Sequence, residues 1–120
     1  MPIEFSVKDG NIALIRVTGK LGKTEYDEVQ REISSLVRAR NKIRILVITQ
    51  DFEGWEKSEE WQDISSVGPN DPFIEKIAIV GDPRWKDLIL LFSLKGMRPV
   101  PIEFFNADSE IKAQDWLNSE

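Results

Sequence analysis

Residues 43–48 read Ile-Arg-Ile-Leu-Val-Ile, a nearly continuous run of branched aliphatic side chains. Such a run is typical of a central strand that is covered on both faces of a sheet. Residues 76–80 form a second apolar run, which ends at Gly81. Residues 100–105 contain a proline and follow another, which favours a strand at the edge of the sheet. These three runs predict the parallel part of an α/β sheet.

Upstream of the central run, the sequence predicts a β-hairpin. Residues 3–8 alternate between apolar and polar side chains, which is the pattern of a half-buried strand. Asp9-Gly10-Asn11 has the composition of a tight turn, and residues 12–19 supply the returning strand.

A helix is expected between the hairpin and the central run, with Thr24 as its N-cap. Its apolar stripe has helical spacing and consists of Tyr26, Val29, Ile33, Leu36 and Val37. Four basic residues follow at the end of this helix: Arg38, Arg40, Lys42 and Arg44. Cations are common at helix C-termini, and an anion-binding patch is the alternative.

Three more helices are expected downstream. A loop and a short helix span residues 51–67, with Ser58 as the N-cap. Asp82 followed by Pro83 predicts the start of a helix that runs to about Leu94. Asp108 is expected to cap a terminal helix that buries Ala113, Trp116 and Leu117. The element order ββαβαβαβα predicts one α/β domain over residues 1–120, a mixed five-stranded sheet with helices on its faces.

The amino-acid composition excludes several kinds of catalytic and metal-binding site. The 120 residues include no Cys and no His, and the formal net charge is −5. Disulfides, thiolate-ligated metals and every nucleophile scheme that needs a histidine are excluded. The acidic balance argues against a nucleic-acid partner. No cofactor or metal is expected, and an enzyme is the least favoured class.

The sequence shows no targeting or membrane-spanning signal. The first residues, Met-Pro-Ile-Glu-Phe-Ser, have neither a basic nor an apolar region of the kind that directs export. No apolar run approaches the roughly 20 residues that cross a bilayer. A cytoplasmic protein is the expectation.

Candidate ligand-binding residues lie after the strands, where open α/β sheets usually bind their ligands. Asp51 with Trp55 and Asp82 with Trp85 both occur at such positions. The two indoles either hold an apolar or planar ligand or close the core beneath their loops. Because Pro83 follows Asp82, helix capping is the simpler role for that carboxylate.

The acidity is concentrated in residues 51–63. This segment holds six of the 21 acidic residues and one of the 16 basic ones, so the rest of the chain is balanced. Its carboxylates lack the offsets of a calcium loop, and nothing fixes a pair of them at a hydrolase spacing. A solvated acidic face around buried aromatic residues is favoured. A cationic partner, if one exists, is expected here.

The helix that begins at Pro83 carries leucines on two sides. At 100° per residue, one face is shared by Trp85, Leu88, Ile89 and Phe92, with Leu91 at its edge. Leu90 and Leu94 fall nearly opposite. This arrangement predicts a second apolar contact, either a homodimer or partner interface or a lid that faces lipid.

Familiar nucleotide and hydrolase motifs are missing from the sequence. Gly22-Lys23-Thr24 matches only the end of a phosphate-binding loop, because Val17 stands where the first glycine is required. Neither a dinucleotide-binding GxGxxG nor a GxSxG nucleophile elbow is present.

Several segments resemble the SpoIIAA-like proteins, bacterial relatives of the STAS domain of anti-sigma-factor antagonists. The segments are Asp51-Phe-Glu-Gly-Trp55 with Trp61, Lys76-Ile-Ala-Ile-Val-Gly-Asp82 with Trp85, Phe104-Phe105 and Ala113-Gln-Asp-Trp-Leu117. The resemblance implies a small α/β domain of undefined biochemical role. It also implies similarity to lipid-carrying CRAL-TRIO folds. An apolar ligand is therefore one of the expected kinds of partner.

One departure from these antagonists concerns their phosphorylated serine, which is typically found in Asp-Ser-Ser-Gly. The same place here reads Asp51-Phe52-Glu53-Gly54, so the phosphoswitch does not carry over. Ser58 is the nearest hydroxyl, among glutamates that oppose a phosphate. Two functions remain: a non-catalytic regulatory module that self-associates through Leu90 and Leu94, and a carrier or sensor of an apolar ligand lined by Phe52, Trp55, Trp61 and Trp85.

Overall fold

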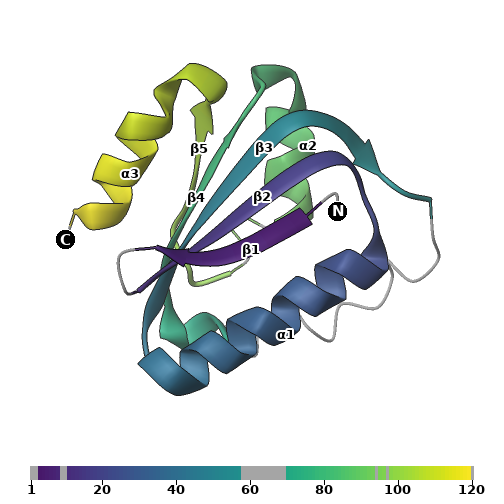
Figure 1. Cartoon of the computed structure of the whole chain (residues 1–120). Coiled ribbons are helices and arrows are strands. Elements are labelled where there is room, and N and C mark those ends of the chain that lie inside the picture. The colour runs from purple at the N-terminus through teal and green to yellow at the C-terminus, as the bar shows by residue number, and fades with distance from the viewer. Residues whose placement is uncertain (1–2, 9–10, 58–69, 94, 97, 120) are drawn as a thin grey trace.

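The computed structural model contains a five-stranded sheet whose strands lie side by side in chain order (Figure 1). β1 (Ile3–Lys8) is antiparallel to β2 (Ile12–Leu21). β3 (Ile43–Trp55), β4 (Ile74–Gly81) and β5 (Ile102–Asn106) continue the sheet in parallel. The structure describes residues 3–8, 11–57, 70–93, 95–96 and 98–119. The predicted hairpin strands, mixed sheet and edge position of the last strand are confirmed.

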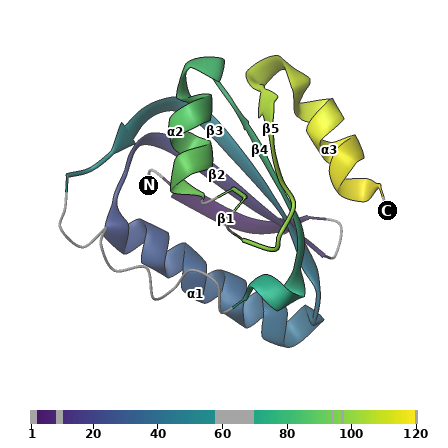
Figure 2. The same cartoon turned by 180° about the vertical axis from the view of Figure 1, so that it is seen from behind.

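Three helices cover the two faces of the sheet. α1 (Lys23–Arg40) and α2 (Lys86–Phe92) lie on one face, and α3 (Glu110–Asn118) lies on the other (Figures 1 and 2). The short helix predicted within residues 51–67 is not confirmed: residues 51–55 belong to β3, and Ser58 lies outside the described residues. Among the described helices, none is long and apolar enough to cross a membrane.

β3 forms the centre of both apolar layers. Ile43 and Ile45 pack with Ile33 of α1 and Ile89 of α2 in the first core cluster. Leu46 and Ile48 turn to the opposite face and pack in a second cluster with α3. Burial on both faces explains why residues 43–48 show almost no polar alternation, as the sequence predicted.

The C-terminus of α3 is held by two cations from the sheet. Lys76 Nζ donates to the carbonyls of Trp116 at 2.8 Å and Ser119 at 2.9 Å, and lies 4.9 Å from the Trp116 ring centroid. Arg44 donates to the carbonyls of Leu117 and Ser119 and pairs with Glu75. The basic residue Arg44 therefore satisfies helix-end carbonyls, where cations also meet the negative end of the helix dipole.

Two predicted helix starts are wrong. α1 begins at Lys23 with Gly22 as its extended N-cap residue, so Thr24 falls inside the first turn. Buried Lys23 fixes this start, because its Nζ pairs with Asp27 one turn later at 2.6 Å. Asp108 lies in a 3₁₀ turn, η4 (Ala107–Ser109), which precedes α3, and it makes no capping hydrogen bond there.

Candidate functional site: an apolar cavity between the sheet and two helices

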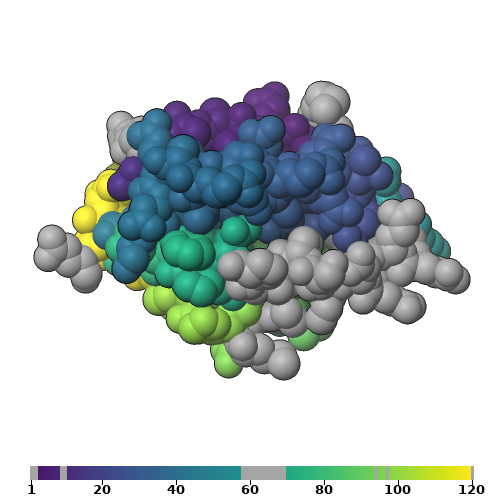
Figure 3. Space-filling model, turned by 90° about the horizontal axis from the view of Figure 1, so that it is seen from below, coloured from purple at the N-terminus to yellow at the C-terminus, as the bar shows by residue number. Residues whose placement is uncertain are grey.

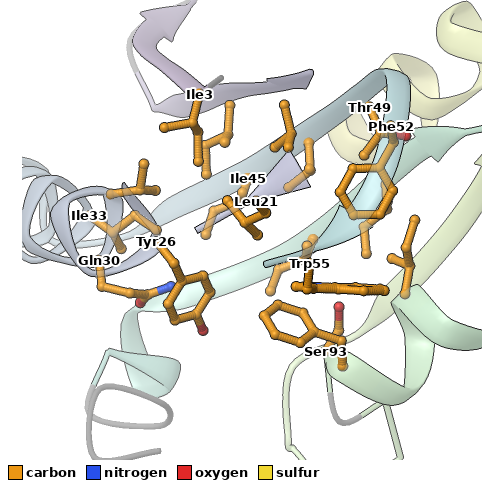
Figure 4. Close-up of a pocket in the computed structure, with 18 of the residues that line it drawn as sticks. Ile3, Leu21, Tyr26, Gln30, Ile33, Ile45, Thr49, Phe52, Trp55 and Ser93 are labelled. Atoms are coloured by element: carbon orange, nitrogen blue, oxygen red, sulfur yellow. The ribbon is translucent and has the colours of Figure 1, made fainter. Parts of the chain in front are cut away.

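An apolar cavity of about 140 Å³ lies between the sheet and helices α1 and α2. Four strands line its roof, and Figure 4 shows Tyr26, Gln30 and Ile33 entering from α1 while Phe52 and Trp55 enter from β3. Most of the described lining side chains are aliphatic or aromatic. The cavity is partly open and runs beneath the sheet to the carboxyl ends of β2 and β3, the region in which the sequence suggested a site.

Two irregularities near the end of β3 shape this cavity. Thr18 of β2 pairs with Gln50, but the next residue, Gly19, pairs with Phe52, and Lys20 pairs with Gly54. Asp51 and Glu53 are therefore extra residues without partners in β2, which is the definition of a β-bulge. Asp51 has a positive φ of 52°, a conformation that Asp tolerates better than most residues.

The bulges decide which side chains face the cavity. Thr49 lines the cavity, and strict alternation would place the side chains of residues 51 and 53 on the same face. Each extra residue shifts that alternation by one. Asp51 and Glu53 are exposed as a result, and Phe52 and Trp55 form part of the cavity wall. The double bulge thus turns two carboxylates outward and brings Phe52 into the cavity wall, while Trp55, after two shifts, keeps the face that strict alternation from Thr49 would give it.

The aromatic side chains form one continuous cluster at this end of the cavity. The ring centroids of Phe52 lie 5.1 Å from those of both Trp55 and Trp85, and Trp55 and Phe92 are also 5.1 Å apart. Tyr26 of α1 meets Phe92 of α2 edge to face at 5.5 Å. These contacts tie β3 to both helices and give the cavity a stiff aromatic wall.

Gly54 allows the Trp85 ring to pack against β3. Its φ is 96°, and a Cβ atom there would lie 3.3 Å from the Trp85 ring. The indole Nε1 atoms of both Trp55 and Trp85 are buried and have no hydrogen-bond partner among the described residues. A buried donor without a partner is uncommon in folded proteins and calls for an explanation.

Polar groups in the wall are few and largely paired. Arg98 binds Asp71 through two hydrogen bonds, 3.0 Å from Nε to Oδ2 and 2.5 Å from Nη2 to Oδ1. This pair joins the 3₁₀ turn before β4, η2 (Asp71–Phe73), to the segment before β5. In the space-filling view, the teal-green part of the chain lies between α1 and the lime-green part (Figure 3). Burial raises the pKa of the Tyr26 hydroxyl, an effect that Arg98 opposes. The phenol is therefore neutral at physiological pH.

The predicted ligand residues divide into two groups. Phe52, Trp55 and Trp85 share the aromatic cluster, although only Phe52 and Trp55 line the cavity. Asp51 and Asp82 are exposed. Asp82 accepts a hydrogen bond from the Arg84 backbone N–H at 3.0 Å, so the capping role predicted for it is confirmed.

The acidic segment is described only as far as residue 57, and Trp61 lies outside the described residues. Asp51, Glu53 and Glu56 are exposed, in agreement with a solvated acidic face. Within the described parts of the chain, no group of three metal-binding side chains comes together.

Sequence reasoning missed the cavity residues contributed by α1 and by the segment before β5. Tyr26 and Ile33 were recognised only as core, and Gln30, Ser93 and Arg98 were not singled out. Alternation gave no signal for Val17 and Thr49, because both β2 and β3 carry apolar side chains on both faces. No local pattern identifies the Asp71–Arg98 pair, because its partners are 27 residues apart.

The orientation predicted for α2 is wrong at Leu90 and at Leu88, which was placed on the buried face and is exposed. The helix is preceded by a 3₁₀ turn, η3 (Pro83–Trp85), in which each residue advances 120° rather than 100°. This rotation brings Leu90 into partial burial against the first core cluster. The exposed leucines of α2 are instead Leu88 and Leu91, at 50% and 72%, and Leu94 lies outside the described residues.

The fold and the site together define a small α/β domain with a hairpin-led mixed sheet and an interior apolar cavity. The SpoIIAA-like family model matches residues 12–118, and the chain belongs to that family. The resemblance seen in the sequence is thereby confirmed.

A solved structure supports the same fold. It is that of an uncharacterised protein of the DUF3478 family with a SpoIIAA-like fold from Shewanella loihica PV-4. The match has a TM-score of 0.71 at 18% sequence identity and covers 96% of this chain and 91% of that one. A comparison with curated proteins gave no significant match.

Proposed function

We propose that this protein is a non-catalytic binding module that takes up a compact apolar ligand in the cavity between the sheet and helices α1 and α2. The observation that carries the proposal is the cavity itself, about 140 Å³ and lined largely by side chains of the first core cluster. Because apolar side chains are normally close-packed, a partly open space lined by isoleucines and aromatic rings leaves apolar surface that a ligand would cover.

The size of the cavity limits the ligand. An engineered protein cavity of roughly 150 Å³ with a similar apolar lining accommodates benzene. The proposed ligand is therefore a molecule built on a single ring or a short branched chain. A carrier that encloses a complete lipid, as the CRAL-TRIO resemblance implied, is less well supported by this volume.

The surroundings of the cavity support a role in binding rather than catalysis. The bulges direct Asp51 and Glu53 to the surface, away from the cavity, and the sequence contains no histidine or cysteine. Phe52 is only 5% exposed and occupies the place of the hydroxyl in the antagonist motif. We therefore also propose that this module works without the phosphorylated serine of the anti-sigma antagonists.

Ligand binding is tested by titrating cumene, a single-ring hydrocarbon, into the protein while recording methyl NMR spectra. The methyl groups of Ile33, Ile45 and Val17 should shift in a saturable manner. Val29→Phe enlarges a buried cavity-lining side chain of α1 and should abolish these shifts. Leu14→Phe is the matched control, because Leu14 packs against the second core cluster on the far face. Cumene that binds wild type and Val29→Phe equally, or neither, contradicts the proposal.

Self-association is a second candidate function, and the exposed leucines of α2 favour it. Leu88 and Leu91 replace the predicted Leu90 and Leu94 as the apolar surface of this helix among the described residues. In sedimentation velocity, wild type should form a dimer that Leu88→Asp/Leu91→Asp dissociates. Ile111→Asp on α3, at a side chain that is 75% exposed, is the control for a lost apolar surface residue. A wild-type monomer at high concentration would refute this candidate.

A further inference from the structure

We propose that the groove between the edge strand β1 and helix α1 binds an extended basic segment of a partner protein, which pairs with β1 as a further strand of the sheet. Three observations carry this inference: an open strand edge, an apolar groove beside it, and a row of glutamates along the groove. The inference does not depend on a cavity ligand, although the buried side chains of Ile3 and Val29 border both the groove and the cavity.

The first observation is the open edge of β1. All of its residues pair with β2 on one side, and no other strand among the described residues pairs with β1 on the other side. In an antiparallel pair, alternate residues turn their backbone N–H and C=O groups away from the partner strand. These groups form a template on which an extended peptide can add a strand.

The second observation is an open groove of about 230 Å³ between β1 and α1. Figure 3 shows β1 (purple) lying along α1 (blue). The apolar part of the groove lining consists of Ile3, Phe5 and Val29. Phe5 is only partly buried, and Val7, two residues further on the same face of β1, is 44% exposed. A strand added to β1 would place every second side chain above this apolar lining.

The third observation is a row of three glutamates, Glu25, Glu28 and Glu32, on the α1 side of the groove. Their spacing of three and four residues places them on one face of the helix, where like charges repel. None of the three forms an ion pair with a described residue. A lysine or arginine of an added strand would cover the apolar lining with its methylene groups and place its charge beside these carboxylates. The groove therefore fits a basic segment better than an apolar or acidic one.

The same glutamates disfavour a second copy of this chain as the occupant. Two copies that paired β1 with β1 around a two-fold axis would place both α1 helices on the same face of the joined sheet. The two rows of glutamates would then lie next to each other across the axis, and their mutual repulsion would oppose the pairing. A basic segment removes this repulsion instead of doubling it.

The inference is tested with a blocked peptide, Lys-Thr-Lys-Thr-Lys-Thr-Lys, whose alternation places every lysine on one face of a strand. A peptide with glutamate in place of each lysine is the charge control. In amide NMR titrations of the wild-type chain at low salt, the basic peptide should shift the signals of β1 and of residues 25–32 in a saturable manner, and the acidic peptide should not. At a concentration about ten times the dissociation constant, alternate amides of β1 should exchange with solvent about tenfold more slowly.

Glu28→Gln/Glu32→Gln isolates the charge of the groove, because it removes two carboxylates and keeps the shape of both side chains. The dissociation constant of the basic peptide should rise about three- to tenfold. Asp108→Asn/Asp115→Asn is the matched control, since it changes the net charge equally at exposed residues of η4 and α3, and α3 lies on the opposite face of the sheet. This control should change the dissociation constant by less than about twofold.

Each outcome decides one part of the inference. A basic peptide that causes no saturable shift overturns it, and so does an acidic peptide that binds as tightly. Equal effects of the two double variants overturn the assignment to this groove. Saturable binding without slower exchange in β1 overturns strand addition. If alternate amides of β1 are already protected in a dimer without peptide, the occupant is a second copy and the inference is wrong. None of these results bears on the cavity ligand, which the cumene titration tests separately.

Discussion

At the scale of single residues, Gly81 marks the tightest packing in the sheet. A Cβ atom at this position would overlap the Oγ1 of Thr49, which donates to the Val80 carbonyl at 3.0 Å. Thr49 pairs with Val17 of β2 and Gly81 pairs with Asn106 of β5, so neither strand can move aside easily. We expect Gly81→Ala to lower the free energy of unfolding by about 1–3 kcal/mol, measured by urea denaturation.

A double variant tests this steric explanation. Thr49→Ala removes the hydroxyl, and the remaining neighbours of a Cβ at Gly81 lie at 3.5 Å and beyond, so the double variant should lose less stability than the sum of the single ones. Gly96→Ala is the control, because nothing lies near that Cβ and only its positive φ of 88° is strained. Strict additivity of Gly81→Ala and Thr49→Ala would contradict the explanation.

Tyr26 provides a spectroscopic test of the aromatic wall. It is the only tyrosine in the sequence, so its ionisation can be followed by ultraviolet absorbance without interference from another. Burial raises its pKa above the ordinary value of 10.0. The unfolded chain therefore releases this proton at a lower pH than the folded one, and stability should fall as the pH rises above 10 and level off above the folded pKa. Tyr26→Phe should remove that part of the pH dependence, and a free-tyrosine titration in the native protein would contradict the burial.

The side chains of residues 51–55 show how far sequence reasoning reaches at this scale. Trp55 was a candidate because it follows a predicted strand, and Phe52 was named with it in the apolar-ligand hypothesis; both line the cavity. Asp51 was grouped with them because it follows an apolar run. Its exposure depends on bulges that arise from pairing with Gly19 and Lys20 of another strand, so no local pattern reports it.

At the scale of elements, the C-terminus of α3 depends on side chains of the sheet. Lys76 satisfies carbonyls of Trp116 and Ser119 and covers the Trp116 ring. We expect Lys76→Met to lower the free energy of unfolding by about 1–2 kcal/mol, since the carbonyls lose a charged donor while the methylene packing is kept. Chemical denaturation of Lys112→Met, at an exposed lysine of the same helix, should show a change below about 0.5 kcal/mol. Equal effects of the two variants would show that Lys76 does not stabilise α3.

Elements with a clear hydrophobic periodicity were predicted well. Elements whose geometry depends on the segment that leads into them, or on pairing with another strand, were not. The stripe of α1 and the two-sided burial of β3 follow from side chains within one segment. The orientation of α2 was missed because Pro83 begins a 3₁₀ turn, which changes the rotation per residue before the helix starts. The length of β3 was missed because Asp51 and Gly54 are residues that usually end a strand and here adopt positive φ within one.

At the scale of the whole molecule, the cavity is a product of tertiary assembly. Its wall draws on β1, β2, β3, β4, α1, α2 and the segment that contains Arg98. The sequence contained most of these residues as core candidates, and it predicted both the sheet and the helices that enclose them. The volume that remains between these residues depends on how completely side chains from seven segments fill it. The order of residues along the chain does not give that volume.

Uptake of a compact ligand into the cavity is tested by a crystal structure of the protein grown with saturating cumene. We expect electron density for one ring inside the cavity, in contact with Ile33 of α1 and Phe52 of β3. A cavity that stays empty, or one filled by the protein's own side chains, would contradict it.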